Sequence, residues 1–152
     1  MKKFVFVILI FYFSLTIISC SEKDEFTATP KASPASWTKQ LGSSSNDDAF
    51  GVATDSSGNV YVTGATTGGL DGNTNAYGND LFVVKYNSSG AKQWTKQLGT
   101  SGHDNARGVA TDSSGNVYVT GRTQGGLDGN TSAGGWNWDI FVVKYNSSGT
   151  KQ

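Results

Sequence analysis

The chain has 152 residues, with twelve basic and twelve acidic side chains and a formal net charge of zero. Setting aside Lys2 and Lys3 leaves ten basic residues (12 − 2 = 10) against twelve acidic ones, a formal charge of −2. No basic patch stands out, which argues against nucleic acid as a partner. The single cysteine excludes an intramolecular disulfide.

The first nineteen residues have the pattern of a secretory signal peptide. Lys2 and Lys3 precede an apolar run from residue 4 to residue 18. This run is shorter than the about 20 apolar residues that a spanning helix needs. Residues 1–19 are therefore predicted to form a signal helix that is removed on export.

A cysteine follows this segment directly, in the tetrapeptide Ile17-Ile18-Ser19-Cys20. The tetrapeptide resembles the lipobox of bacterial lipoproteins, although the usual box prefers leucine at the first position and glycine or alanine before the cysteine. The resemblance implies a lipid on Cys20, the membrane as a partner, and a place in the bacterial cell envelope, at the outer membrane. The alternative is an ordinary signal or an uncleaved anchor with an incidental cysteine.

Residues 20–36 form a polar segment that contains both prolines of the chain. The segment shows neither helical nor strand periodicity. It is predicted to be a disordered, flexible tether between the lipid and the folded part.

The remainder consists of two near-copies of one segment, residues 37–93 and residues 94–152. Both copies begin with W-T-K-Q-L-G, so that Trp37 corresponds to Trp94 and Asp71 to Asp128. The second copy is longer in its loop at 134–138, and beyond this loop Asp80 corresponds to Asp139. A fixed period indicates one supersecondary unit that buries its apolar faces against its neighbours.

Each copy contains short β-rich runs divided by clusters of Gly, Asn, Asp and Ser, and no helical period. A turn is predicted at residues 55–59 and a long loop at residues 67–79. The predicted strands cover residues 50–54, 60–64, 81–86 and 91–98 of the first copy and residues 109–111, 117–121 and 140–145 of the second.

The third predicted strand is apolar on both of its faces. Because side chains alternate along a strand, Phe82, Val84 and Tyr86 share one face. Leu81 and Val83 share the other. A sheet that is apolar on both sides must be covered on both sides, and four-stranded sheets stacked by radial repetition are propeller blades. The predicted fold is all-β, with two four-stranded antiparallel blade repeats that form a partial β-propeller.

The order of these motifs supports the same fold. The segment D-S-S-G-N-V-Y-V-T-G, followed by D-[LI]-F-V-V-K-Y and W-T-K-Q-L-G, resembles the SBBP family of bacterial β-propeller repeats. The resemblance covers residues 37–152. It implies a propeller fold and supplies no catalytic set.

Two blades are fewer than the four to eight with which propellers typically close. An uncovered blade face of roughly 300 Å² forfeits up to several kcal/mol at ~25 cal/mol per Å². The second copy stops where its fourth strand is expected to begin, and residues 37–41 are predicted to be an unpaired strand of that type. Either several chains self-associate, each lending this strand to a neighbour, or the chain is a truncated fragment of a longer propeller protein.

Oxygen-bearing loops are the candidate metal site. Asp71 and Asn73, and Asp128 and Asn130, place oxygen ligands at alternate positions, as calcium prefers. The bidentate acid that completes an EF-hand is missing, and D-G-N is also an ordinary turn. The sequence therefore assigns no metal and no other cofactor.

A serine and an acid lie near His103, the one histidine, in Ser101-Gly102-His103-Asp104, which invites a hydrolase interpretation. Asn46 stands at the corresponding position of the first copy, and no nucleophile elbow is present. His103 is therefore predicted to decorate a surface loop.

Trp136 and Trp138 occur only in the inserted loop of the second copy. Exposed aromatic side chains are typical binding anchors, so these two are candidate contacts to a glycan or protein ligand. The alternative is that they fold onto the blade edge and cover it.

The sequence favours a lipid-anchored envelope protein that acts as a non-enzymatic binding or scaffold module. The competing interpretations are a glycan-acting envelope enzyme and a fragment of a longer propeller protein.

Overall fold

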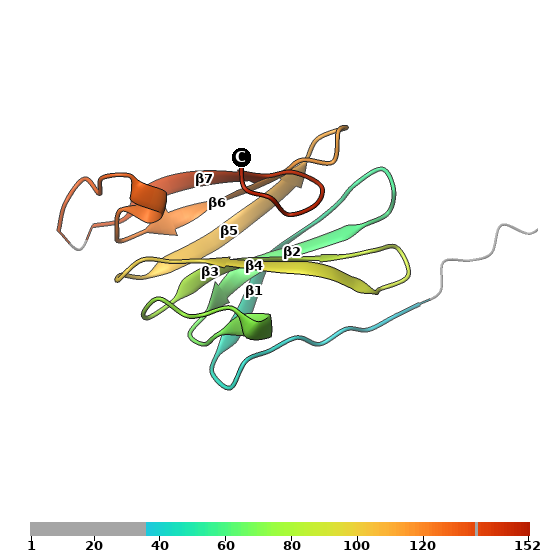
Figure 1. Ribbon diagram of the computed structural model, residues 1–152, viewed down its shortest axis with the longest axis horizontal. Coiled ribbons are helices and arrows are strands. Elements are labelled where there is room, and N and C mark those ends of the chain that lie inside the picture. The colour runs from blue at the N-terminus through green and yellow to red at the C-terminus, as the bar shows by residue number, and fades with distance from the viewer. Residues whose placement is uncertain (1–35, 136) are drawn as a thin grey trace, which may run out of the picture. The chain divides into compact units, whose positions relative to one another are not determined.

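The computed structural model describes residues 36–135 and 137–152, which belong to one unit of the chain (Figure 1). The predicted signal peptide at 1–19, Cys20, nearly all of the tether and Trp136 lie outside the described residues. Within the described part, no helix combines the length and the hydropathy that crossing a bilayer requires.

The described residues form two antiparallel sheets, each with its strands in chain order, which we term blade 1 and blade 2. The prediction of an all-β fold with two blade repeats is thus confirmed. Blade 1 contains β1 (Asp47–Thr54), β2 (Val60–Thr66), β3 (Asp80–Tyr86) and β4 (Lys92–Leu98), and blade 2 contains β5 (Asp104–Thr111), β6 (Val117–Thr123) and β7 (Asp139–Tyr145). Short 3-10 turns, η1 (Leu70–Gly72) and η2 (Leu127–Gly129), lie in the two long loops.

The first strand of each blade begins earlier than predicted. β1 starts at Asp47 rather than residue 50, and β5 starts at Asp104 rather than residue 109. The pairing register shifts at residue 50 in β1 and at residue 107 in β5. Each shift is a β-bulge, which breaks the alternation of side chains along the strand. The first half of each strand therefore could not be predicted from a hydrophobic pattern of period two.

Residues 37–41 do not form a strand, so that prediction is wrong. A strand needs a neighbouring backbone to satisfy its N–H and C=O groups, and no strand in the described residues pairs with this segment. Blade 2 correspondingly has three strands and not four. Its fourth position is marked by a single bridge between Tyr145 and Lys151.

The two blades pack face to face, and the main hydrophobic core lies between them. Blade 1 contributes to this core the face of β3 that carries Leu81 and Val83. The opposite face of β3, which carries Phe82, belongs to a second, smaller cluster. Both faces of this strand are therefore apolar and covered, as the alternation predicted. The central side chains of the main core are Tyr61, Leu81 and Val83 from blade 1 and Val117, Val119, Phe141, Val143 and Tyr145 from blade 2.

A glycine of β1 lies close to the backbone of β5. A Cβ atom at Gly51 would lie 3.2 Å from the methyl of Thr63 and 3.4 Å from the carbonyl oxygen of Arg107. These distances leave no room for a larger side chain without movement. A side chain at Gly51 would therefore require its neighbours to shift by a few tenths of an ångström.

An aspartate closes the tight turn after the first strand of each blade. The Asp55 carboxylate accepts hydrogen bonds from the backbone N–H groups of Ser57 and Asn59 at 3.0 Å and from the Tyr61 hydroxyl at 3.0 Å. Partial desolvation acts to raise the pKa of Asp55, but these hydrogen bonds and that of the Asn59 side chain outweigh it and lower the pKa. Asp112 repeats the arrangement in blade 2.

Candidate functional site

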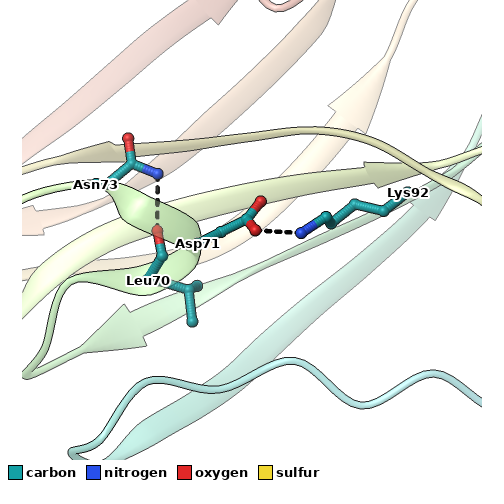
Figure 2. A network of polar contacts seen from close by, with 4 residues as sticks. All are labelled: Leu70, Asp71, Asn73 and Lys92. Atoms are coloured by element: carbon teal, nitrogen blue, oxygen red, sulfur yellow. Dashed lines mark hydrogen bonds and ion pairs between the residues drawn. The ribbon is translucent and has the colours of Figure 1, made fainter.

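The D-G-N loops do not gather their oxygen atoms around one point. Asp71 adopts a left-handed backbone with φ 55°, and its carboxylate forms an ion pair with Lys92 of β4. The Asn73 amide instead donates to the carbonyl oxygen of Leu70 at 2.8 Å. Figure 2 shows the Asp71 and Asn73 side chains directed to these separate partners. The hydrogen bond from Lys92 lowers the pKa of Asp71.

Blade 2 repeats this loop with an ion pair between Asp128 and Lys151 and a hydrogen bond from the Asn130 amide to the Leu127 carbonyl at 2.8 Å. Across the described ranges, no three His, Cys, Asp or Glu side chains gather in a way that could hold a metal ion. The two loops therefore contact Lys92 at the start of β4 and Lys151 at the matching position of blade 2.

His103 lies at the seam between the blades. Its Nδ1 atom accepts a hydrogen bond from the backbone N–H of Asn79 at 3.2 Å. The neighbouring Asp104 carboxylate accepts from the Thr100 backbone N–H at 2.6 Å and from the Thr123 hydroxyl. Because the acid is occupied by these groups, His103 and Asp104 do not form the acid–histidine pair of a hydrolase triad.

One of the two inserted tryptophans can be placed. The guanidinium carbon of Arg122 lies 4.0 Å from the ring centroid of Trp138, and Trp138 is 39% exposed. The two residues stand where blade 1 has Ala65 and Asn79. This half-exposed cation–π pair has no counterpart in blade 1, because neither Ala65 nor Asn79 is aromatic or charged.

The outer face of blade 2 presents apolar side chains to solvent. Ile140 is 90% and Val142 is 70% exposed. The corresponding residues of blade 1, Leu81 and Val83, are 0% exposed because blade 2 covers them. Single exposed apolar residues are common on surfaces, whereas a contiguous patch marks an interaction site.

The outer face of blade 1 carries a groove of about 330 Å³. Its walls are the segment 37–41 on one side and β2 and β3 on the other. Trp37 covers Tyr86, with ring centroids 5.9 Å apart. The apolar lining includes Trp37, Leu41, Val60, Val62, Phe82 and Val84.

Sequence reasoning had singled out Trp138 but not its partner. Arg122 replaces Ala65 within a stretch in which most positions of the two copies are identical. The two replacements, Ala65 by Arg122 and Asn79 by Trp138, are the sequence differences by which the pair could have been found. The role of Gln97 in joining β4 to the long loop was also missed, since it depends on a contact with Leu70, far away along the chain.

Comparison with known proteins supports the repeat assignment. The family described as the SBBP β-propeller repeat matches residues 36–71 and 93–128. The chain is similar to the regulatory protein FlaEY of Caulobacter vibrioides, at 32% identity over 76% of this chain and 13% of that protein. It is also similar to the uncharacterized WD repeat-containing protein L264 of Acanthamoeba polyphaga mimivirus, at 29% identity over 74% of this chain and 10% of that protein. The chain thus spans a small part of the length of these relatives.

Proposed function

The chain carries two SBBP β-propeller repeats, and we propose that it is a non-enzymatic binding or scaffold module, held at the bacterial cell envelope by a lipid on Cys20. The observation that carries the binding role is the exposed Arg122–Trp138 pair on one blade of a repeat scaffold. The polar clusters that suggest chemistry, around His103 and Asp71, have internal partners in the structure.

The lipid anchor is supported by the signal-like residues 1–19 and by the place of Cys20 directly after them. Its test is metabolic labelling of the full chain in a bacterial host with a clickable fatty acid. The wild-type chain is expected to carry the label and to sediment with membranes, and Cys20→Ala is expected to lose the label. An unlabelled wild-type chain, or equal labelling of the variant, contradicts the anchor.

The ligand of the binding module is proposed to be a glycan or a protein that stacks on Trp138, with Trp136 of the same loop as a further contact. Aromatic rings and arginine contribute large contact areas at binding sites. The test is cosedimentation of the full chain with insoluble envelope polysaccharide and capture of envelope proteins on the immobilised chain. Trp138→Ala and Trp136→Ala are expected to reduce retention with the fold unchanged.

Tyr77 provides the matched control for this test. It is 64% exposed and lies in the corresponding loop of blade 1. Tyr77→Ala is expected to leave retention unchanged. Equal loss in the Tyr77 and Trp138 variants would mean that any exposed aromatic residue retains the ligand, and the specific site would be wrong.

A further inference from the structure

We infer that the protein assembles head to tail with second copies of itself, through an interface that repeats the contact between its own two blades. In this assembly, the outer face of blade 2 of one copy packs on the outer face of blade 1 of the next. Residues 37–41 of the second copy add to the free edge of β7 as a fourth strand. The inference does not depend on the proposed lipid anchor or on a glycan ligand.

β7 of blade 2 exposes the strand face with which its counterpart β3 contacts blade 2. Leu81 and Val83 of β3 are 0% exposed in the contact between the blades. Their counterparts in the second copy, Ile140 and Val142 of β7, are 90% and 70% exposed. β7 thus presents on its outer face the apolar pair with which β3 contacts blade 2, while Arg122 of β6 stands where blade 1 has the buried Ala65.

The outer face of blade 1 provides the other half as a groove, in which the side chains of β3 are buried and those of β2 are half-buried. Val117 and Val119 of β6 are 0% exposed beneath blade 1. The matching residues of the first copy, Val60 and Val62 of β2, are half-buried and line the groove on the outer face of blade 1. The outer face of blade 2 therefore matches the outer face of blade 1 and does not match itself. A contact between different surfaces of two copies is a head-to-tail contact.

The segment 37–41 contacts blade 1 through Trp37. Trp94 of β4 packs on Tyr145 of blade 2 and donates from its indole N–H to the Ser147 carbonyl at 3.2 Å. Trp37 packs on Tyr86 and donates to the Ser88 carbonyl at 3.3 Å. Residues 37–41 therefore already lie on blade 1 as β4 lies on blade 2, although no strand in the described residues pairs with their backbone.

Blade 2 contains a cavity that matches the surroundings of Gln97 in blade 1 and could accept the Gln40 side chain. In blade 1, the Gln97 side chain accepts from the Leu70 N–H at 2.9 Å and donates to the Gly68 carbonyl at 3.0 Å and to the Asp80 carboxylate at 2.9 Å. In blade 2, the matching residues Leu127, Gly125 and Asp139 line a cavity of about 430 Å³. Gln40, which occupies the place of Gln97 in the W-T-K-Q-L sequence, is exposed.

A lysine contact completes the correspondence. Lys85 of blade 1 donates from Nζ to the Ser147 carbonyl of blade 2 at 3.1 Å. Lys144, its counterpart on the outer face of blade 2, is half-buried, and the assembly directs it to the Ser88 carbonyl of the next copy. Strand addition at a free edge together with pockets for alternate side chains is an established mode of recognition.

The first test is the mass of the full chain in mild detergent, measured by light scattering and sedimentation over a range of concentrations. The wild-type chain is expected to form assemblies of two or more copies. The double variant Ile140→Lys, Val142→Lys removes the apolar surface at side chains that are already exposed, so folding is retained. It is expected to weaken association roughly a hundredfold, which corresponds to about 2.8 kcal/mol at 1.4 kcal/mol for each factor of ten.

Two further variants separate the specific interface from other association. Gln40→Ala is expected to weaken association by roughly tenfold or more, whereas Tyr77→Lys, at an exposed loop residue, is expected to leave it unchanged. A wild-type chain that stays monomeric at every concentration overturns the inference. Assembly that survives the Ile140 and Val142 substitutions also overturns it.

Cross-linking tests the register directly. Val83 pairs with Lys96 between β3 and β4, so Val142 of one copy is expected to lie opposite Lys39 of the next. Mixed Lys39→Cys and Val142→Cys chains are expected to give a disulfide-linked peptide pair, identified by mass spectrometry apart from Cys20. A control mixture of Lys39→Cys with Tyr77→Cys is expected to give none. Equal linkage in both mixtures, or none in the first, overturns the strand addition.

Discussion

Phe50 and Arg107 occupy the bulges of β1 and β5, and the guanidinium carbon of Arg107 lies 4.2 Å from the centroid of the Phe50 ring. The two positions correspond in the repeat, as Trp37 and Trp94 do. A bulge turns one extra side chain out of the sheet. Here, the extra side chains of the two bulges, Phe50 and Arg107, contact each other and so connect the two blades.

We expect this contact to be energetically coupled. Cation–π pairs at exposed sites contribute about 0.5–1 kcal/mol, and Phe50 is 40% exposed. A double-mutant cycle of Phe50→Ala and Arg107→Ala in urea unfolding is expected to return a coupling free energy of about 0.5–1 kcal/mol in the stabilising direction. Strictly additive single effects would show that the stacking adds nothing to stability.

Gln97 is expected to be important for the free energy of unfolding, and Gln40 is expected to be dispensable in the monomer. Gln97→Ala removes the partner of the Leu70 N–H and one of the two hydrogen bonds to the buried Asp80 carboxylate, which keeps that from the Ala76 N–H. This loss is expected to cost about 1–3 kcal/mol. Gln40→Ala, in the same W-T-K-Q-L context, is expected to change stability by less than about 0.5 kcal/mol. Urea unfolding at low protein concentration measures both variants, and equal losses would contradict this role of Gln97.

Trp94 and Trp37 form a second matched pair. The Trp94 ring lies between Tyr61 and Tyr145, with centroids 6.0 and 6.3 Å away, whereas Trp37 contacts the ring of Tyr86 on one outer face. Trp94→Ala is therefore expected to destabilise the fold by about 3 kcal/mol or more, and Trp37→Ala by about 1 kcal/mol. Thermal unfolding ranks the two variants. The reverse order would contradict a core between the blades.

Acid is expected to destabilise the protein through its turn aspartates. Hydrogen bonds lower the pKa of Asp55, against the opposing effect of desolvation, and lower that of Asp112, led by the Asn116 side chain. A lowered pKa contributes stability that is present above the unfolded value of about 3.9 and is lost as the pH falls through the folded value. The free energy of unfolding is therefore expected to decrease as the pH falls below about 4.

The control for this prediction is substitution of each turn aspartate. Asp55→Asn and Asp112→Asn are each expected to lower stability at neutral pH and to make its decline in acid shallower. Denaturant unfolding across the acid range measures both effects. A slope unchanged by the two substitutions together would assign the acid sensitivity to other carboxylates, such as Asp47 and Asp71, whose pKa values are also lowered.

The strands could be predicted from local patterns, because alternation along residues 81–86 fixed both faces of β3 before any contact was known. The state of residues 37–41 could not be predicted in this way. Their sequence equals that of the matching part of β4, and whether it forms a strand depends on a partner backbone elsewhere. The same limit applies to the pairing of Asp71 with Lys92, which lie apart in the sequence, since a loop of oxygen-bearing residues looks alike with or without a cation.

The outer faces of blade 1 and blade 2 correspond to the two sides of the contact between the blades. This correspondence affects how a gene of this kind can change in length. An in-frame copy of one repeat unit, such as residues 37–93, would insert a blade whose two sides already match its neighbours. No compensating substitution would be required for it to fit. Descendants of this gene are therefore expected to differ by whole units, with breakpoints that fall at the same place in the period.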